Sequence, residues 1–164
     1  MTTHPFDKLE LDNGAAVIFT PCPGTKAAQL QDSVAQLKAA GAAAVVSAMY
    51  DAELEKLGAS ELENVCEANQ LDWYQFPLAD DAPPNDDFTQ AYKNHITQLV
   101  ALLASKKAIA VHCKGGSGRT GLTIALVLVA LGLSKEAAKA QVQAMRPKAL
   151  THPAQLAFFE AFEV

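Results

Sequence analysis

The sequence predicts a single α/β domain over residues 1–164, with a mixed, mostly parallel central sheet flanked by helices. Apolar, strand-like runs alternate along the chain with segments of helical periodicity, which is typical of a parallel sheet. The chain opens with a hairpin pattern, which adds an antiparallel strand. A length of 164 residues is close to the usual size of one domain, and 50% hydrophobic residues can fill its core.

The first half of the chain predicts the hairpin, two strands and three helices. The turn sequence at 12–14, Asp-Asn-Gly, lies between two apolar runs and predicts the hairpin. Apolar residues at 30, 34 and 37 recur at helical spacing, so a helix is expected there with Thr25 or Asp32 as its N-terminal cap. In order, the expected elements are strands at 8–11 and 15–19, this helix ending at Gly41, a strand at 43–49, helices at 52–57 and 60–69, and a strand at 71–76.

The second half predicts one more strand and four helices. A proline-containing loop at 79–87 precedes a helix at 88–105, which Asp86 and Asp87 are expected to cap. A short apolar strand at 108–111 follows. The remaining chain reads as three helices, at 120–131, 135–145 and 153–162.

Composition restricts the possible partners and compartment. The formal net charge is −5 and the basic residues are scattered, which argues against nucleic acid as the main partner. Three cysteines at irregular spacing indicate neither a disulfide framework nor a metal site, so no metal and no cofactor are expected. Residues 1–7 carry no leader signal and the most apolar run, at 122–133, is too short to cross a bilayer. We therefore expect a cytoplasmic protein with no membrane span and reduced thiols.

The segment His112-Cys113-Lys114-Gly115-Gly116-Ser117-Gly118-Arg119-Thr120 carries the clearest chemistry in the sequence. It joins a strand to a helix, where backbone N–H groups converge and hold a phosphate or sulfate-like anion. Its glycines let the backbone bend tightly around such an anion.

Four side chains of this segment have expected catalytic roles. A cysteine beside a helix N-terminus and a guanidinium is a thiolate at neutral pH, so Cys113 is the expected nucleophile on phosphorus. Arg119 can bind two phosphate oxygens with its planar fork. Thr120 can donate its hydroxyl to the sulfur as the sulfur leaves, and His112 can orient the loop and tune the thiolate by hydrogen bonding.

Two other phosphate-binding motifs resemble this segment in part. Gly116, Gly118 and Gly121 match the dinucleotide spacing, but that motif requires a second strand after its helix, and none is predicted. A nucleotide P-loop ends in Gly-Lys-Ser/Thr, whereas here Arg119 and Thr120 occupy the end. Both alternatives are therefore minor ones.

On these residues the sequence resembles the Cys-x5-Arg protein phosphatases of the dual-specificity branch, because residues 112–120 fill every fixed position of His-Cys-x-x-Gly-x-x-Arg-Ser/Thr. The pattern Pro-Cys-Pro-Gly at 21–24, the pattern Phe-Pro-Leu-Ala-Asp at 76–80, Arg146 and Gln155 extend the resemblance to the kinase-associated phosphatases over residues 15–163. It implies a phosphocysteine intermediate and a phosphoprotein substrate carrying phosphotyrosine or phosphoserine/threonine.

The resemblance also implies a general acid in a second loop. Asp80 fits by position, just after a strand, and its neighbour Asp81 is the alternative. Gln155 matches a position that helps to place the hydrolytic water, although a polar residue near a helix start explains it equally well. Arg146 either braces the loop from behind or is a charge at a helix C-terminus.

Three further questions stay open at the level of sequence. Lys114 adds positive charge to the pocket, and a lysine at this position occurs in lipid-phosphatase relatives, so activity on phosphoinositides or other small monoesters is an alternative. A weakly active phospho-binding module is an alternative of another class. Cys22 and Cys66 are expected to be packing residues, with a resolving role toward Cys113 as the alternative. The oligomeric state is not predicted.

Overall fold

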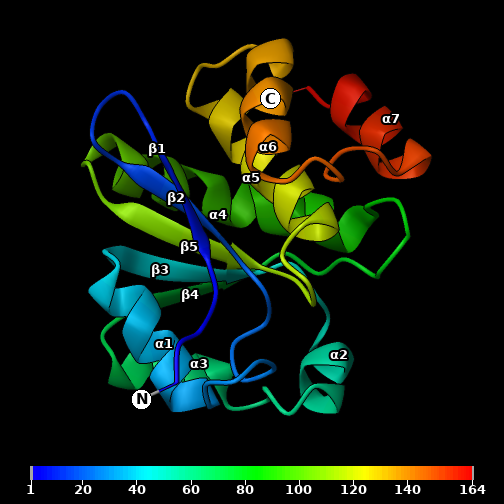
Figure 1. The fold of residues 1–164 in the computed structure, drawn as a ribbon. Coiled ribbons are helices and arrows are strands. Elements are labelled where there is room, and N and C mark those ends of the chain that lie inside the picture. Colours follow the sequence, from blue (N-terminus) through cyan, green and yellow to red (C-terminus); the bar gives the residue numbers. More distant parts are fainter. Residues whose placement is uncertain (1, 164) are drawn as a thin grey trace.

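Five strands form one sheet in the computed structural model, which describes residues 2–163. They are β1 (Asp7–Glu10), β2 (Ala16–Thr20), β3 (Ala42–Ser47), β4 (Asp72–Gln75) and β5 (Ala108–His112). Their order across the sheet is β1-β2-β5-β3-β4; β1 is antiparallel to β2, and all other pairs are parallel (Figure 1). The predicted mixed, mostly parallel sheet is thus confirmed.

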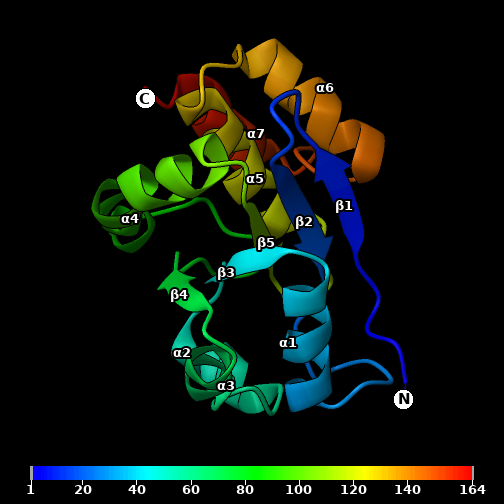
Figure 2. The ribbon, with the colours of Figure 1, turned by 90° about the vertical axis from the view of Figure 1, so that its left-hand side faces the viewer.

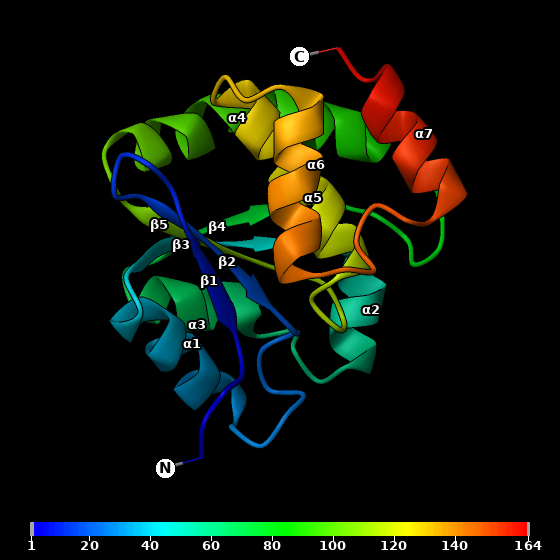
Figure 3. The ribbon, with the colours of Figure 1, turned by 45° about the horizontal axis from the view of Figure 1, so that its top comes forward.

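Helices cover both faces of the sheet. One face carries α1 (Leu30–Ala39), α2 (Asp51–Lys56) and α3 (Leu62–Ala68). The other side holds α4 (Asp86–Ala104), α5 (Gly118–Ala130), α6 (Lys135–Met145) and α7 (Pro153–Ala161). Figures 2 and 3 show that α4 and α5 lie nearer the sheet, while α6 and α7 pack against α5 from outside.

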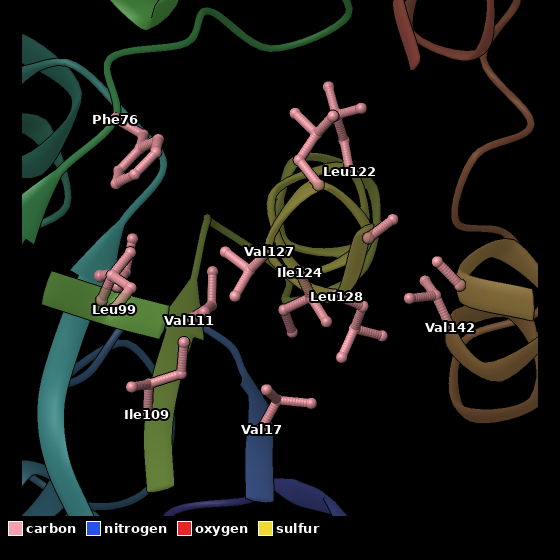
Figure 4. Close-up of a cluster of buried hydrophobic side chains, with 14 of the residues drawn as sticks. Val17, Phe76, Leu99, Ile109, Val111, Leu122, Ile124, Val127, Leu128 and Val142 are labelled. Carbon is pink, nitrogen blue, oxygen red and sulfur yellow. The ribbon is translucent and has the colours of Figure 1, made fainter. Parts of the chain in front are cut away.

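The central strands are apolar on both faces because each face packs on helices. Odd-numbered residues of β2 such as Val17 point toward α5, and even-numbered ones such as Ile18 point toward α1 and α3. Figure 4 shows the larger core, in which Val17, Ile109 and Val111 of the sheet meet the apolar side chains of α5. Burial on both sides holds the strand ends, and the loops that follow them, in fixed positions.

Helix α5 lies inside the domain rather than on its surface. All residues from Arg119 to Leu128 are buried, which suits a helix that is hydrophobic all round. A Cβ at Gly121 would lie 2.5 Å from the Ala149 Cβ and 3.2 Å from Val142 Cγ1, so this glycine permits close packing of the chain behind α5. The described chain has only helices after α5, so the dinucleotide-binding alternative is wrong.

Two of the expected helix caps are wrong. Helix α1 begins after Gln29 and has no side-chain cap, because Thr25 closes an earlier turn on Cys22 O and Asp32 already lies in the first helical turn. Helix α4 is capped by Asn85, whose Oδ1 accepts from the backbone N–H two residues later at 3.0 Å. Asp86 and Asp87 occupy its first turn instead, where a negative charge is favourable to the helix dipole.

The carboxyl ends of the four parallel strands meet at one edge of the sheet. Thr20, His112, Ser47 and Gln75 end these strands and lie side by side in register. The loops that follow them therefore converge at this edge, where ligands bind in open α/β sheets. No helix among residues 2–163 has the length and hydrophobicity needed to cross a bilayer.

Candidate active site

A cavity of about 440 Å³ opens at this edge of the sheet. Its lining comes from the loops after β2, β4 and β5, from the end of α2 and from the first turn of α5: Thr25, Lys26, Leu57, Asp80, Cys113, Lys114, Gly115, Ser117, Gly118 and Arg119. Cys113 is 4% exposed, and its Sγ accepts the backbone N–H of Gly116 at 3.3 Å. Most residues of the predicted phosphate loop are thus assembled around one depression.

The loop turns its backbone carbonyls outward. The Cys113 carbonyl accepts from His112 Nδ1 at 3.1 Å, and the Lys114 carbonyl accepts from Cys22 N at 3.1 Å. The Gly116 carbonyl accepts from Arg146 Nε at 3.2 Å. The Ser117 carbonyl accepts from Gly121 N at 2.7 Å.

These outward carbonyls determine where the N–H groups point. In a trans peptide the N–H of the next residue points opposite to the carbonyl. The four N–H groups that consequently face the cavity belong to Lys114, Gly115, Ser117 and Gly118, which all line it. Such a ring of N–H groups at the start of a helix has the geometry that suits an anion.

Gly116 is the glycine that this loop cannot replace. Its φ is +84°, and a Cβ there would lie 2.7 Å from the Thr20 backbone carbonyl. By contrast, a Cβ at Gly115 or Gly118 would meet nothing within 4 Å. The loop therefore rests directly on the end of β2 at Gly116.

Arg119 is fixed along two of its three donor edges. Glu53 accepts from Nη1 at 2.6 Å and from Nη2 at 2.8 Å, and the Leu78 carbonyl accepts from Nη1 at 3.1 Å. The third edge, formed by Nε–H and the remaining Nη2–H, is left for a ligand; Nε is buried without a hydrogen-bond partner in the described chain. This free edge is a fork that suits two phosphate oxygens.

Glu53 was missed in the sequence. It lies in α2, directly after β3, and β3 is the sheet neighbour of β5, which leads into the phosphate loop. The hydrogen bonds from Arg119 hold the pKa of Glu53 below its usual value, so the pair stays charged at neutral pH. An acidic residue just after a buried strand is the only signal that the sequence offered.

Asp80, and not Asp81, lies at the cavity. Its Oδ1 is 3.7 Å from Arg119 Nε, and its side chain is 66% exposed. Asp81 adopts a left-handed backbone with φ +56° and does not line the cavity. The geometry thus favours Asp80 among the two candidate acids.

Three contacts hold the loop that carries Asp80. Its start is held by the Leu78 carbonyl on Arg119, and its end by Asn85, whose Nδ2 donates to the Tyr50 hydroxyl at 3.2 Å. Between them, Gln155 Nε2 donates to the Ala82 carbonyl at 3.1 Å. Gln155 is 4% exposed and does not line the cavity, so it contacts the acid loop, and its role toward a hydrolytic water stays a prediction.

The side chains of His112 and Thr120 lie beneath the loop. His112 is fully buried, and burial lowers its pKa to about 4, so the imidazole is neutral. The Thr120 hydroxyl is buried without a hydrogen-bond partner in the described residues, and its bond to the Cys113 sulfur stays a prediction.

The remaining expected residues brace or pack around the loop. Arg146 ends α6, contacts Gly116 as described, pairs with Asp7 of β1, and places its guanidinium carbon 5.6 Å from the centre of the Phe19 ring. It therefore fulfils both expected roles, brace and helix terminus. Cys22 and Cys66 are free thiols, and burial raises the pKa of each to about 12, as in packing residues.

Two exposed lysines stand at the rim of the cavity. Lys114 was expected there, whereas Lys26, from the loop after β2, was not. Lys26 follows the turn at residues 21–24, and only the fold brings that turn beside the phosphate loop, where Cys22 N meets the Lys114 carbonyl. Together with Arg119 they make the cavity positive in a chain of net charge −5.

Solved structures of phosphatases share this fold. A kinase associated phosphatase with a serine in place of its catalytic cysteine aligns with a TM-score of 0.82 and 21% identity, covering 96% of this chain and 93% of its own. A putative protein tyrosine phosphatase from Leishmania major aligns at 0.68 with 20% identity, covering 99% and 100%. Human DUSP28 aligns at 0.67 with 17% identity, covering 97% and 93%. At these identities the likeness establishes the fold.

The family follows from the sequence match. No curated protein matches the chain significantly. Residues 23–157 match the family described as "Swiss Army Knife protein, DSP-PTPase phosphatase domain", which spans the whole cavity lining. The chain therefore belongs to the dual-specificity type of protein tyrosine phosphatases, in the group named Swiss Army Knife phosphatases.

Proposed function

We propose that the chain hydrolyses phosphate monoesters on proteins through a phosphocysteine intermediate. The observation that carries this proposal is the cavity itself, where the Cys113 sulfur lies among inward N–H groups and beside the free edge of Arg119. These donors stabilise the charge on three phosphoryl oxygens, which is the largest requirement of phosphoryl transfer.

In the first step the Cys113 thiolate forms a bond to phosphorus and the ester P–O bond breaks. The leaving oxygen takes the proton of Asp80, since expulsion of an alkoxide is slow without a placed acid. In the second step the Asp80 carboxylate takes a proton from water, whose oxygen attacks phosphorus as the S–P bond breaks. Thr120 donates to the departing sulfur, and inorganic phosphate is released.

The exposure of Asp80 supports a broad choice of phosphorylated side chain. With 66% of this side chain exposed, the acid stands at an open rim rather than in a deep slot. Phosphotyrosine and phosphoserine/threonine both reach such a site. The fold shared with a kinase associated phosphatase supports a protein substrate, and a cytoplasmic location stays a prediction.

A direct test is the hydrolysis of an aryl phosphate by wild type, Cys113→Ser and Cys66→Ser. We expect Cys113→Ser to lose nearly all activity, and Cys66→Ser, a buried thiol remote from the cavity, to retain it. Acid quenching during turnover should trap a phosphocysteine in wild type and in Cys66→Ser but not in Cys113→Ser. Equal rates in wild type and Cys113→Ser would overturn the mechanism, and tight phosphopeptide binding without turnover would indicate a binding module.

Lys26 and Lys114 favour a second candidate, the hydrolysis of small substrates that carry several phosphates. Both ammonium groups lie at the rim, where a second phosphate of the same molecule would reach them. The comparison is kcat/KM for phosphopeptides against a soluble inositol bisphosphate, in wild type and Lys26→Ala. A kcat/KM at least tenfold higher for the inositol compound in wild type, with this preference lost in Lys26→Ala, would show that small substrates with several phosphates are the preferred class.

A further inference from the structure

A series of three hydrogen bonds, partly buried at Trp73 and buried at Ser47 and His112, connects the edge strand β4 with the nucleophile. Trp73 Nε1 lies 2.9 Å from Ser47 Oγ, and Ser47 Oγ lies 2.6 Å from His112 Nε2. His112 Nδ1 lies 3.1 Å from the carbonyl of Cys113. Ser47 and His112 are paired residues of β3 and β5, so the register of the sheet sets the distance between these two side chains.

The chemistry of the four groups gives these bonds one direction. An indole nitrogen only donates and a carbonyl only accepts, so His112 Nδ1 must carry the proton that reaches the Cys113 carbonyl. Because His112 is neutral, its Nε2 then carries none and accepts from Ser47. The Ser47 hydroxyl gives its single proton to His112 and accepts from Trp73.

The opposite tautomer of His112 would break this arrangement. With the proton on Nε2, the bare Nδ1 would face the Cys113 carbonyl, so two lone pairs would meet at 3.1 Å. The Ser47 hydroxyl therefore selects the tautomer, and the indole of Trp73 orients that hydroxyl. Both residues therefore help to hold the Cys113 carbonyl outward. Because this carbonyl points outward, the N–H of Lys114 points into the cavity.

We propose that Ser47 and Trp73 are positioning residues for the nucleophile, which act by holding His112 in the Nδ1–H tautomer. Neither residue lines the cavity, and Trp73 is half-buried at the far side of β3. The inference rests on the proposed role of Cys113. It adds two residues outside the phosphate loop, from strands that end at the same sheet edge.

The tautomer can be observed directly in the wild-type protein. A long-range ¹H–¹⁵N NMR spectrum at pH 7 should show His112 protonated on Nδ1 alone. The chain contains one tryptophan, so its single indole N–H resonance should shift in Ser47→Ala. A His112 protonated on Nε2 in wild type would overturn the proposal without any variant.

The functional test is the rate at which iodoacetamide alkylates Cys113 as a function of pH. We expect the rate in Ser47→Ala at pH 6 to fall about tenfold, as for the loss of one buried hydrogen bond, with its midpoint at higher pH. The alkylation rate should fall less in Trp73→Phe, because the hydrogen bond from Ser47 to His112 remains. Ser134→Ala, which loses the N-cap bond of α6 at 3.1 Å, is the matched control and should behave as wild type.

The outcomes separate the two proposals. A wild-type Cys113 that is alkylated no faster than Cys22 at pH 6 would refute its role as nucleophile. A fast wild-type reaction with unchanged rates in Ser47→Ala would refute the positioning role alone. If Ser47→Ala does not fold, an unchanged pH profile in Trp73→Phe refutes the role of the indole, and the NMR tautomer decides that of Ser47.

Discussion

The phosphate loop at 113–119 and the acid loop at 77–85 face each other across one cavity, yet they are built differently. The phosphate loop is anchored at nearly every carbonyl, and its key side chains Cys113 and Arg119 are 4% and 2% exposed. The acid loop is held at three points, and Asp80 is 66% exposed. The first loop thus depends on the core of the domain, whereas the second depends on a few local contacts.

The two loops therefore meet two different requirements of the proposed reaction. Charge stabilisation needs several donors fixed in place, which only a rigid, buried backbone provides. Proton transfer needs one carboxyl group within reach, which an exposed loop provides. Changes in the acid loop should therefore alter activity with little effect on stability, and changes in the phosphate loop should alter both.

Among the changes that test this comparison of the two loops, Asp80→Asn has the largest expected effect. It removes the acid, so kcat for substrates with poor leaving groups should fall about 10²–10⁴-fold, and far less for aryl phosphates with good ones. Asp81→Asn is the matched control, since asparagine tolerates the positive φ of that position. Thermal unfolding of both variants should match wild type. If kcat for poor leaving groups falls in Asp81→Asn and not in Asp80→Asn, the general acid is Asp81.

Gly116→Ala should damage the opposite loop. Its Cβ would collide with the Thr20 carbonyl at 2.7 Å, and its φ of +84° is strained for alanine. A displacement of the loop should lower kcat/KM about 10²-fold and should also lower the midpoint of urea unfolding. Gly115→Ala has open space for its Cβ, so it should lower both kcat/KM and the urea midpoint much less. Equal losses in the two variants would contradict the packing argument.

Glu53→Gln tests the side-chain anchor of the phosphate loop. The amide would place N–H groups against one Nη of Arg119 and lose a charged bond, so kcat/KM should fall about tenfold or more. Glu55→Gln in the same helix is exposed and makes a matched control. The measurement is kcat/KM for an aryl phosphate. Equal values in the two variants would show that the carbonyl of Leu78 alone suffices to orient Arg119.

The smallest effect concerns pH and stability. Burial lowers the pKa of His4, and it lowers that of His112 from 6.5 to about 4. Below pH 6.5 the unfolded chain binds protons that the folded chain does not, so stability is complete above that pH and falls as pH decreases. For His112 the loss is about 2 kcal/mol at pH 5. The free energy of unfolding from urea titrations should be lower at pH 5 than at pH 7.5. Equal values at the two pH values would contradict the prediction.

The sequence predicted the sheet and the phosphate loop because their residues are contiguous. Period and apolar runs identify strands, and the spacing from His112 to Thr120 is set by local backbone geometry. The sheet and this loop need only chain order and the rule that parallel strands end together. Asp80 was predicted from the family resemblance, which implies an acid in a second loop, and from its position just after a strand.

The residues that sequence reasoning missed act across strands. Glu53 contacts Arg119 and Ser47 contacts His112, while Lys26 lines the same cavity. Only the register of β2, β5 and β3 brings these three residues there. The cap at Asn85 was missed for a local reason, because two acidic neighbours were equally good candidates.

The burial of α5 has an electrostatic consequence for catalysis. This helix of 13 residues is about 20 Å long and has no charged side chain except Arg119. Its N-terminal end lies at the cavity, where Arg119 and Thr120 are buried, while its C-terminal end at Leu131 and Gly132 is solvated. Water screens the C-terminal pole more strongly than an N-terminal pole that a bound anion covers. Toward the phosphate of the proposed reaction, α5 therefore acts as a fixed positive partial charge that no proton can neutralise and that does not change with pH.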